Sequence, residues 1–329
     1  MRIVVLLGGR SSEHDVSLAS ARSVIDALER RGNDVVTVAI DRQGGWLLDS
    51  GQKAIEAASR VPSKEVATRL ADADVVFPVL HGPFGEDGTV QGLLELAGVA
   101  YVGAGVLGSA LCMDKDIFKS VMRDHGIPVT ANITLRLGDK PRNPYGYPCF
   151  VKPARLGSSV GITKAHDEGE LSEGVHLAFE HDEKVLVEEC VDGIEVEVGV
   201  LGNRTPSASL PGEIVVTRSE WYDYSAKYDE GEMDLMIPAR ITPDQIERVQ
   251  RLAVEAFVAT DCEGMARADM FVRSDGEVLV NELNTIPGFT ATSVYAKLFE
   301  ASGLPYGELL ERLCELALER RARKAALRY

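Results

Sequence analysis

Three oxygen-bearing side chains occupy two neighbouring stretches near the end of the chain, "MARADMFV" with Asp269 and "VLVNELNTIPGF" with Glu282 and Asn284. Side chains alternate along a strand, so Glu282 and Asn284 are expected on one face, with Val280 and Leu283 on the other. The residues "RSDG" between the stretches predict an antiparallel pair with Asp269 beside Glu282. Two carboxylates and an amide suit Mg²⁺, which completes its shell with water and substrate phosphates. A polar strand end facing solvent is the alternative.

A second group of residues could bind phosphate. In "FVKPARLGSSVG" an apolar strand leads to Lys152, and Lys115 stands at the start of a predicted helix. A lysine at the end of such a strand is costly unless it meets an anion. The spacing matches neither GxxxxGK[ST] nor GxGxxG, and a Gly-Ser hairpin with a surface lysine is the alternative. Backbone N–H groups and hydroxyls that could close over phosphates come from Gly157, Ser158, Ser159 and Gly161.

Four glutamates follow in "VLVEECVDGIEVEVGVL". Glu188 and Glu189 end one predicted strand, and Glu195 and Glu197 lie in the next. Carboxylates can accept hydrogen bonds from an adenine amino group or from ribose hydroxyls, which makes a nucleoside pocket a hypothesis. For Glu189 and Glu197 the favoured interpretation is the solvent face of a strand.

Composition restricts the class of protein. The chain has 329 residues, 45% of them hydrophobic, which is enough for about two or three domains with their own cores. Its formal charge of -16 argues against a nucleic-acid or acidic-membrane surface. The apolar run at the start is too short to span a bilayer and is followed at once by Gly, Ser and charged residues, so a cytosolic protein is expected. The five cysteines form no CxxC pair and are expected to be reduced and mostly buried.

The elements that must position these residues begin with "RIVVLL", a buried-strand pattern followed by a helical one that ends at Gly32. Similar strand patterns at 34–40 and 73–80 predict an open parallel sheet with helices on its faces. Ligands of such sheets bind beyond the carboxyl ends of the strands. The Gly-rich loop "HGPFGEDGTVQG" (81–92) lies there, and an ordinary turn before a helix is the alternative.

Later segments read as strands and helices, with two exceptions. Residues 211–239 are polar and aromatic and lack periodicity, which predicts a long loop that is either functional or disordered. The closing helix ends in a basic tail, which is interpreted as favourable charge at a helix C-terminus plus a solvated end. The tail comprises Arg320, Arg321, Arg323, Lys324 and Arg328.

Taken together and in order, the chain resembles the ATP-grasp superfamily and, within it, the D-alanine:D-alanine ligases. The resemblance is carried by "GGRSSEHDVSL", "HGPFGEDGTVQG", "VKPARLGSSVG" and "ARADMF...VNELNTIPGFTATS", which span nearly the whole chain. It implies an α/β fold of three domains, in which a Rossmann-like parallel sheet precedes two α+β domains that hold ATP between them. The expected divisions are 1–113, 114–191 and 192–329, with a lid loop at about 217–239. An excess of length near 45–70 carries no interpretable motif.

The resemblance also assigns nucleotide and metal ligands. Glu188 would accept from the adenine amino group and Glu195 would hold the ribose, while Lys115, Lys152 and Lys227 would contact phosphates. The loop containing Ser159 would cover them. Two Mg²⁺ (or Mn²⁺) ions are implied, with Glu282 bridging them, and a monovalent cation activator is allowed. The metal ligands by this resemblance are Asp269, Glu282 and Asn284.

For the reacting groups, the resemblance places Glu13 on the ammonium of the first D-alanine, in a hydrogen-bonded set with Ser158 and Tyr228 that closes the lid. Arg267 and the Gly288 N–H would stabilise the tetrahedral intermediate. Two further residues would lie near the second D-alanine, namely His81 and Ser293.

The implied reaction is ATP-dependent formation of D-alanyl-D-alanine through an acyl phosphate, in the cytoplasm, for peptidoglycan precursor synthesis. A homodimer is expected, without nucleic-acid or membrane partners. The alternatives are a D-alanine:D-lactate or D-alanine:D-serine ligase of the same fold, or a catalytically silent nucleotide-binding module. A Rossmann oxidoreductase lacks its glycine fingerprint here.

Overall fold

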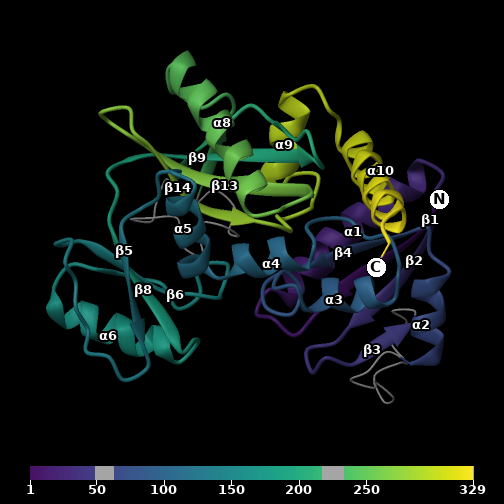
Figure 1. The fold of residues 1–329 in the computed structure, drawn as a ribbon, viewed down its shortest axis with the longest axis horizontal. Helices are drawn as coiled ribbons and strands as arrows, with labels where there is room; N and C mark the ends of the chain where they lie inside the picture. Colours follow the sequence, from purple (N-terminus) through teal and green to yellow (C-terminus); the bar gives the residue numbers. More distant parts are fainter. Residues whose placement is uncertain (49–62, 217–232, 329) are drawn as a thin grey trace.

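The computed structural model describes residues 1–48, 63–216 and 233–328. They form three sheets, one from each of the three predicted segments of the chain (Figure 1). The mixed α/β fold class is confirmed, and the exact domain boundaries stay a prediction. Among the described residues, no helix combines the length and apolar character that crossing a bilayer requires.

The N-terminal sheet has the strand order β3-β2-β1-β4. Strand β1 pairs in parallel with β2 and β4, as the sequence predicts, while the short β3 adds an antiparallel edge. Alternate β1 residues serve two cores, so that one face lies under α1 and α10 and the other under α2 and α3. The elements are β1 (Arg2–Gly8), α1 (His14–Arg30), β2 (Asp34–Ile40), β3 (Trp46–Leu48), α2 (Lys64–Ala71), β4 (Val75–Leu80) and α3 (Thr89–Leu96).

The central sheet is antiparallel with the order β5-β8-β6-β7. Cys149 and Val151 of β6 face a core covered by α6, which turns Phe150 and Lys152 to the opposite face. Two helices, α4 and α5, precede this sheet. The elements are α4 (Val106–Met113), α5 (Lys115–Asp124), β5 (Asn132–Arg136), β6 (Cys149–Pro153), β7 (Thr163–Ala165), α6 (Glu168–Phe179) and β8 (Lys184–Glu189).

The C-terminal sheet follows the order β12-β11-β9-β13-β14, with β10 paired to β9. Its buried face packs on α8 and α5. The expected loop at 211–239 is wrong at both ends, because β11 and β12 pair there, and the predicted lid overlaps β12. The elements are β9 (Gly193–Gly202), β10 (Ser207–Ala208), β11 (Gly212–Val216), β12 (Met233–Met236), α8 (Pro243–Ala259), β13 (Gly264–Arg273), β14 (Val278–Asn284), α9 (Val294–Ala301) and α10 (Tyr306–Ala325).

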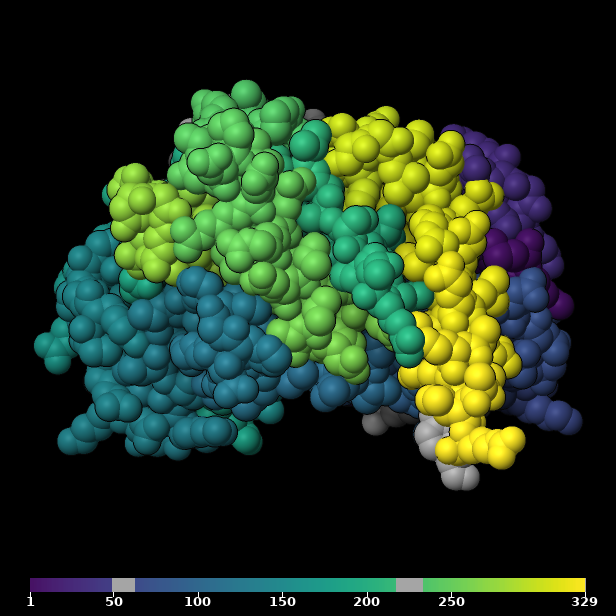
Figure 2. Space-filling model, turned by 45° about the horizontal axis from the view of Figure 1, so that its top comes forward, coloured from purple at the N-terminus to yellow at the C-terminus, as the bar shows by residue number. Residues whose placement is uncertain are grey.

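Helix α10 lies along the boundary between the C-terminal sheet and the N-terminal part, as Figure 2 shows in yellow. Arg323 and Lys324 lie in the last turn of α10, where favourable charge is predicted, but the expectation of a solvated end is wrong for Arg320. Arg320 is only 4% exposed and donates to the carbonyl oxygens of Tyr101 and Gly103. Arg323 pairs with Glu263, the residue before β13, and Lys324 pairs with Glu95 of α3. These ion pairs join the end of α10 to the C-terminal sheet and to a helix of the N-terminal part.

The cysteines agree with their prediction. All five are free thiols, and Cys190 alone is not fully buried.

Candidate active site

The register of three antiparallel strands gathers the polar side chains of the C-terminal sheet on one face. Asp269 of β13 stands opposite Glu282 of β14 and opposite Glu197 of β9. The residues next to these acids along the strands, such as Ala268 and Val198, fill the core on the other face. Side-chain alternation therefore separates an apolar face from an acidic one within the same strands.

A β-bulge between Asp269 and Met270 adjusts this arrangement. Met270 pairs with Val280 and Asp269 with Glu282, which leaves Asn281 as the extra residue. Strict alternation would put Val280 and Glu282 on the same face. The bulge turns Val280 into the core while Glu282 keeps the acidic face. The predicted placement of Val280 is therefore confirmed, but the bulge causes it and not the side-chain alternation on which the prediction rests.

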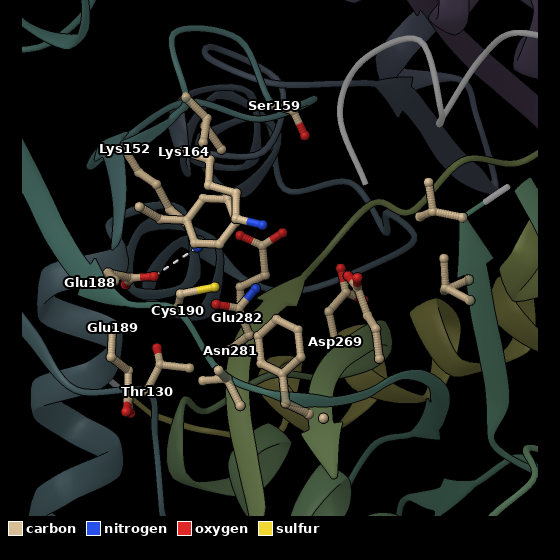
Figure 3. A pocket seen from close by; sticks show the side chains of 18 of the residues that line it. Thr130, Lys152, Ser159, Lys164, Glu188, Glu189, Cys190, Asp269, Asn281 and Glu282 are labelled. Carbon is tan, nitrogen blue, oxygen red and sulfur yellow. Dashed lines mark ion pairs between the residues drawn. The ribbon is translucent and has the colours of Figure 1, made fainter. Parts of the chain in front are cut away.

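One cavity of about 410 Å³ lies between the central and C-terminal sheets. In Figure 3, Lys152 and Glu188 reach it from the central sheet, and Asp269 and Glu282 from the C-terminal sheet. The resemblance implies a nucleotide site in this place. The predicted residues that line it are Lys115, Lys152, Ser159, Glu188, Glu195, Asp269 and Glu282.

A second cavity of about 540 Å³ adjoins the first. Glu282 borders both cavities, so the two share a junction at this carboxylate. Lys227 and Tyr228 lie outside the described residues. The predicted substrate, catalytic and metal residues that line the second cavity are Glu13, His81, Ser158, Arg267, Glu282, Asn284, Gly288 and Ser293.

Basic side chains contact the carboxylates of the predicted metal ligands. The Lys115 ammonium is 3.0 Å from a Glu282 oxygen, and the Arg267 guanidinium contacts both Asp269 oxygens at 2.7 and 2.8 Å. The Asn284 amide also donates to Asp269, at 2.9 Å. The described residues hold no cluster of three or more His, Cys, Asp or Glu side chains suited to a metal. Two carboxylates and an amide on one face still fit a hard divalent cation that draws further oxygens from water and phosphate.

The interpretation of Glu197 as an acid on the solvent face of a strand is wrong. It is fully buried, and an oxygen of its carboxylate lies 2.9 Å from Arg267 Nε. Arg267 is therefore held between Glu197 and Asp269. Glu189 is half-buried and pairs with Arg273 at 2.6 Å.

The loop between β6 and β7 meets the start of α1. The Ser158 hydroxyl donates to Glu13, which links residues from two predicted domains. Ser158 and Ser159 both adopt left-handed backbone angles, with φ of 52° and 57°. Such angles are costly for residues other than glycine and often accompany functional sites.

Lys119 is a site residue that the sequence interpretation missed. Its side chain is almost fully buried and its ammonium lies 3.0 Å from one oxygen of Glu188, while Lys152 lies 2.7 Å from the other. A signal was available, because Lys115, Phe118, Lys119 and Met122 follow the spacing of a buried helical stripe. A lysine inside such a stripe indicates a buried anion.

We expect Glu188→Gln to lower the free energy of unfolding by about 3 kcal/mol at pH 7, because it leaves buried lysine charges without their carboxylate. Burial alone would raise the pKa of Glu188, but the charges of Lys119 and Lys152 outweigh it and bring this pKa to about 2, from 4.5. The stabilisation is thus complete above pH 4.5 and is lost as the pH falls toward 2. Urea unfolding without nucleotide at pH 7 and pH 3 measures the difference.

Glu189→Gln is the matched control for this prediction. It makes the same change at the adjacent residue, whose carboxylate is more exposed, and we expect a loss below about 1 kcal/mol. Equal losses for the two variants, or a difference for Glu188→Gln that does not shrink at low pH, would contradict the buried ion-pair account.

Comparisons with known proteins cover the whole chain. A family model described as D-ala D-ala ligase N-terminus matches residues 2–104, and one described as D-ala D-ala ligase C-terminus matches residues 121–315. A D-alanine–D-alanine ligase of Deinococcus radiodurans is 49% identical, over 97% of this chain and 99% of that protein. Two solved structures are each 36% identical. The D-alanine-D-alanine ligase from Coxiella burnetii has a TM-score of 0.84, with 99% of this chain and 96% of that chain covered. The VanG D-Ala:D-Ser ligase from Enterococcus faecalis has a TM-score of 0.81, with 96% and 99% covered.

The C-terminal family model includes the strands that carry the acidic face. Identity of this level over nearly full length, with the fold shared throughout, goes beyond a likeness of architecture. The chain, with its ATP-grasp fold, therefore belongs to the D-alanine–D-alanine ligase family.

Proposed function

We propose that this enzyme joins two D-alanines to D-alanyl-D-alanine, with ATP converted to ADP and phosphate, as a step in making peptidoglycan precursors. The observation that carries the proposal is the position of Glu282 at the junction of the two cavities. A nucleotide in the first cavity and amino acids in the second would meet at this carboxylate. Phosphoryl transfer requires that meeting of ATP with an acceptor.

In the nucleotide cavity, Glu188 and Glu195 would bind the adenine amino group and the ribose. Lys115 and Lys152 would contact phosphates, which requires them to exchange their present carboxylate partners for phosphate oxygens. Such an exchange keeps a cation paired with an anion throughout. Ser159 would help to cover the phosphates. Lys227, which is not among the described residues, would also contact them.

Asp269, Glu282 and Asn284 would hold two Mg²⁺ or Mn²⁺ ions. When bound, divalent ions neutralise phosphate charge and favour in-line transfer. Arg267 and Lys115 already show that cations approach these carboxylates closely. A monovalent cation activator is compatible with the proposal.

In the second cavity, Glu13 would hold the ammonium of the first D-alanine. The carboxylate of this first D-alanine attacks the γ-phosphate to give an acyl phosphate. The amine of the second D-alanine then displaces phosphate from the acyl phosphate. Arg267 and the Gly288 N–H would stabilise the tetrahedral intermediate. Ser293 would bind the second carboxylate, and its hydroxyl lies within 3.0 Å of the Thr290 N–H.

Ser158 and Tyr228 would complete a hydrogen-bonded set with Glu13 that closes the lid, because an exposed acyl phosphate would react with water. The proposal includes division into domains at 113 and 191, a homodimer and a cytoplasmic location.

The test is release of phosphate from ATP and Mg²⁺ with D-alanine, L-alanine, D-serine and D-alanine plus D-lactate, with products identified by mass. We expect phosphate with D-alanine alone, matched by D-alanyl-D-alanine. Phosphate that appears only with a mixed pair would instead support a D-alanine:D-serine or D-alanine:D-lactate ligase. ATP binding without turnover on any pair would support a silent nucleotide-binding module.

Tyr228→Phe tests the product preference. The resemblance to the ligase family implies that "AKY" favours the dipeptide product, because family members that make D-alanyl-D-lactate differ at this position. We expect the variant to use D-lactate more readily relative to D-alanine, as measured by competition between the two acceptors at neutral pH. Unchanged product ratios would remove Tyr228 from the specificity set.

A further inference from the structure

The loop after β4 fixes the His81 imidazole relative to the end of β14. The ring atom Nδ1 lies 3.0 Å from the Ile286 carbonyl oxygen, and the Ser11 hydroxyl donates to the His81 carbonyl at 2.6 Å. The same Ile286 is held from its other side, since its N–H donates to Glu86 at 3.0 Å. The second Glu86 oxygen accepts from the Gly82 N–H at 2.7 Å. The side chains of His81 and Glu86, both from the loop after β4, therefore hold Ile286 in the loop after β14.

These contacts determine the tautomer of His81. A carbonyl oxygen can only accept, so Nδ1 carries the hydrogen and Nε2 keeps its lone pair in the neutral ring. Burial lowers the pKa of His81 below its ordinary value, which favours the neutral ring at neutral pH. Among the described residues, Nε2 is buried and has no hydrogen-bond partner. The neutral ring thus presents Nε2 as a base, and no described group of the protein donates a hydrogen to it.

The second cavity has to receive two amino acids, each with an ammonium group. On the described residues, two buried side-chain acceptors without a partner border it, Glu13 Oε2 and His81 Nε2. The other oxygen of Glu13 already accepts from Ser158. Glu13 is placed on the first ammonium in the proposed function, which leaves the imidazole for the second.

Resting on that proposed function, we propose that His81 Nε2 is the general base that removes a proton from the ammonium of the second D-alanine. The amine that results attacks the acyl phosphate, so that a C–N bond forms and the C–O bond to phosphate breaks, with the electron pair leaving on phosphate. The nitrogen loses its second proton to the departing phosphate, which is released as hydrogen phosphate. His81 returns the first proton to solvent before the next turnover.

Charged groups around the ring support this proton transfer. Glu13 and Glu86 lie on the loops that pack around His81, and Arg267 faces it from β13. The carboxylate of Glu13 stabilises the imidazolium that forms when Nε2 takes the proton, whereas burial and Arg267 oppose it. The imidazolium is consequently a short-lived state that readily gives up its proton. Glu86 acts as a positioning residue through Ile286.

His81→Asn tests the assignment, because asparagine keeps a donor near the position of Nδ1 and removes Nε2. The sharp comparison is between D-alanine and hydroxylamine as acceptors of the D-alanyl group, since hydroxylamine is already unprotonated at neutral pH and needs no base. We expect D-alanyl-D-alanine formation to fall by about 100-fold, the usual contribution of a general base. D-alanyl hydroxamate formation should change by less than about threefold by the same principle.

A pH series adds a second readout. With the base removed, only amine that is already unprotonated reacts, so the dipeptide rate of His81→Asn should rise about tenfold per pH unit between 7 and 9. His176→Asn is the matched control, because His176 Nδ1 also contacts a backbone carbonyl, that of Ser172, but lies exposed on α6. It should behave as wild type.

Equal losses with both acceptors at every pH would overturn the base assignment and leave His81 a positioning role. If wild type itself gives neither dipeptide nor hydroxamate, the proposed function falls and the assignment with it. The two failures are therefore distinguishable from the wild-type measurement alone.

Discussion

Glu282→Gln should lower D-alanine-dependent phosphate release at least ~100-fold while leaving the fold intact, because it removes an anionic ligand from the junction of the two cavities. Glutamine fills the same volume but carries no charge to hold a divalent ion. The side chain is largely buried and lies 3.0 Å from the Lys115 ammonium, so that lysine also loses its partner. Steady-state kinetics over a range of Mg²⁺ concentrations and thermal unfolding give the two measurements.

The control for this prediction is Glu277→Gln in the turn of the same hairpin. The Glu277 side chain is 44% exposed and pairs with Arg273 at 3.6 Å. Its loss should leave the rate within about twofold, as for other exposed pairs. Retention of more than a few per cent of activity in Glu282→Gln, or full recovery at high Mg²⁺, would remove Glu282 from the essential metal ligands.

The sequence was sufficient for contacts that are local or set by a turn. The pairing of Asp269 with Glu282 follows from one short hairpin, and the parallel N-terminal strands follow from their apolar runs. In both cases side-chain alternation or strand length determines the outcome within a few residues. The extra residue at Asn281 could not be predicted, because a bulge leaves no fixed signature in the hydrophobic pattern.

Contacts between distant segments explain the wrong interpretations. Glu197 reads as one acid in an alternating strand, and its burial follows from the pairing of β9 with β13, which places it against Arg267. Arg320 reads as part of a basic tail, and its burial follows from the packing of α10 on the N-terminal sheet. A charged residue is buried when a partner from another segment compensates it, and that partner is not visible in the local sequence.

Glu86 shows an intermediate case. The Gly-rich loop "HGPFGEDG" contains two acids, and the sequence does not indicate which of them turns inward. Burial raises the pKa of Glu86 to about 8, with the charge of Glu13 acting in the same direction. Its two backbone hydrogen bonds join this loop to Ile286, a contact that only the folded chain reveals.

Arg267→Lys should lower kcat by about 10²- to 10³-fold, the usual cost of removing a donor that stabilises charge in the transition state. The Arg267 guanidinium bonds both oxygens of Asp269 and also reaches Glu197, and its planar shape makes all three contacts possible at once. A lysine ammonium keeps the charge but cannot reproduce that fork. It would therefore leave the buried Glu197 carboxylate poorly compensated and would place the charge away from the reacting centre.

The Michaelis constant for ATP should stay within about threefold, because Arg267 borders the second cavity and is absent from the lining of the first. This separates it from Glu282, whose loss should affect both nucleotide use and turnover. Arg251→Lys is the matched control, since Arg251 lies exposed on α8 and pairs with Glu255 at 3.5 Å. A large rise in the Michaelis constant for ATP with little change in kcat would show that Arg267 acts in nucleotide binding, and the transition-state role would have to be abandoned.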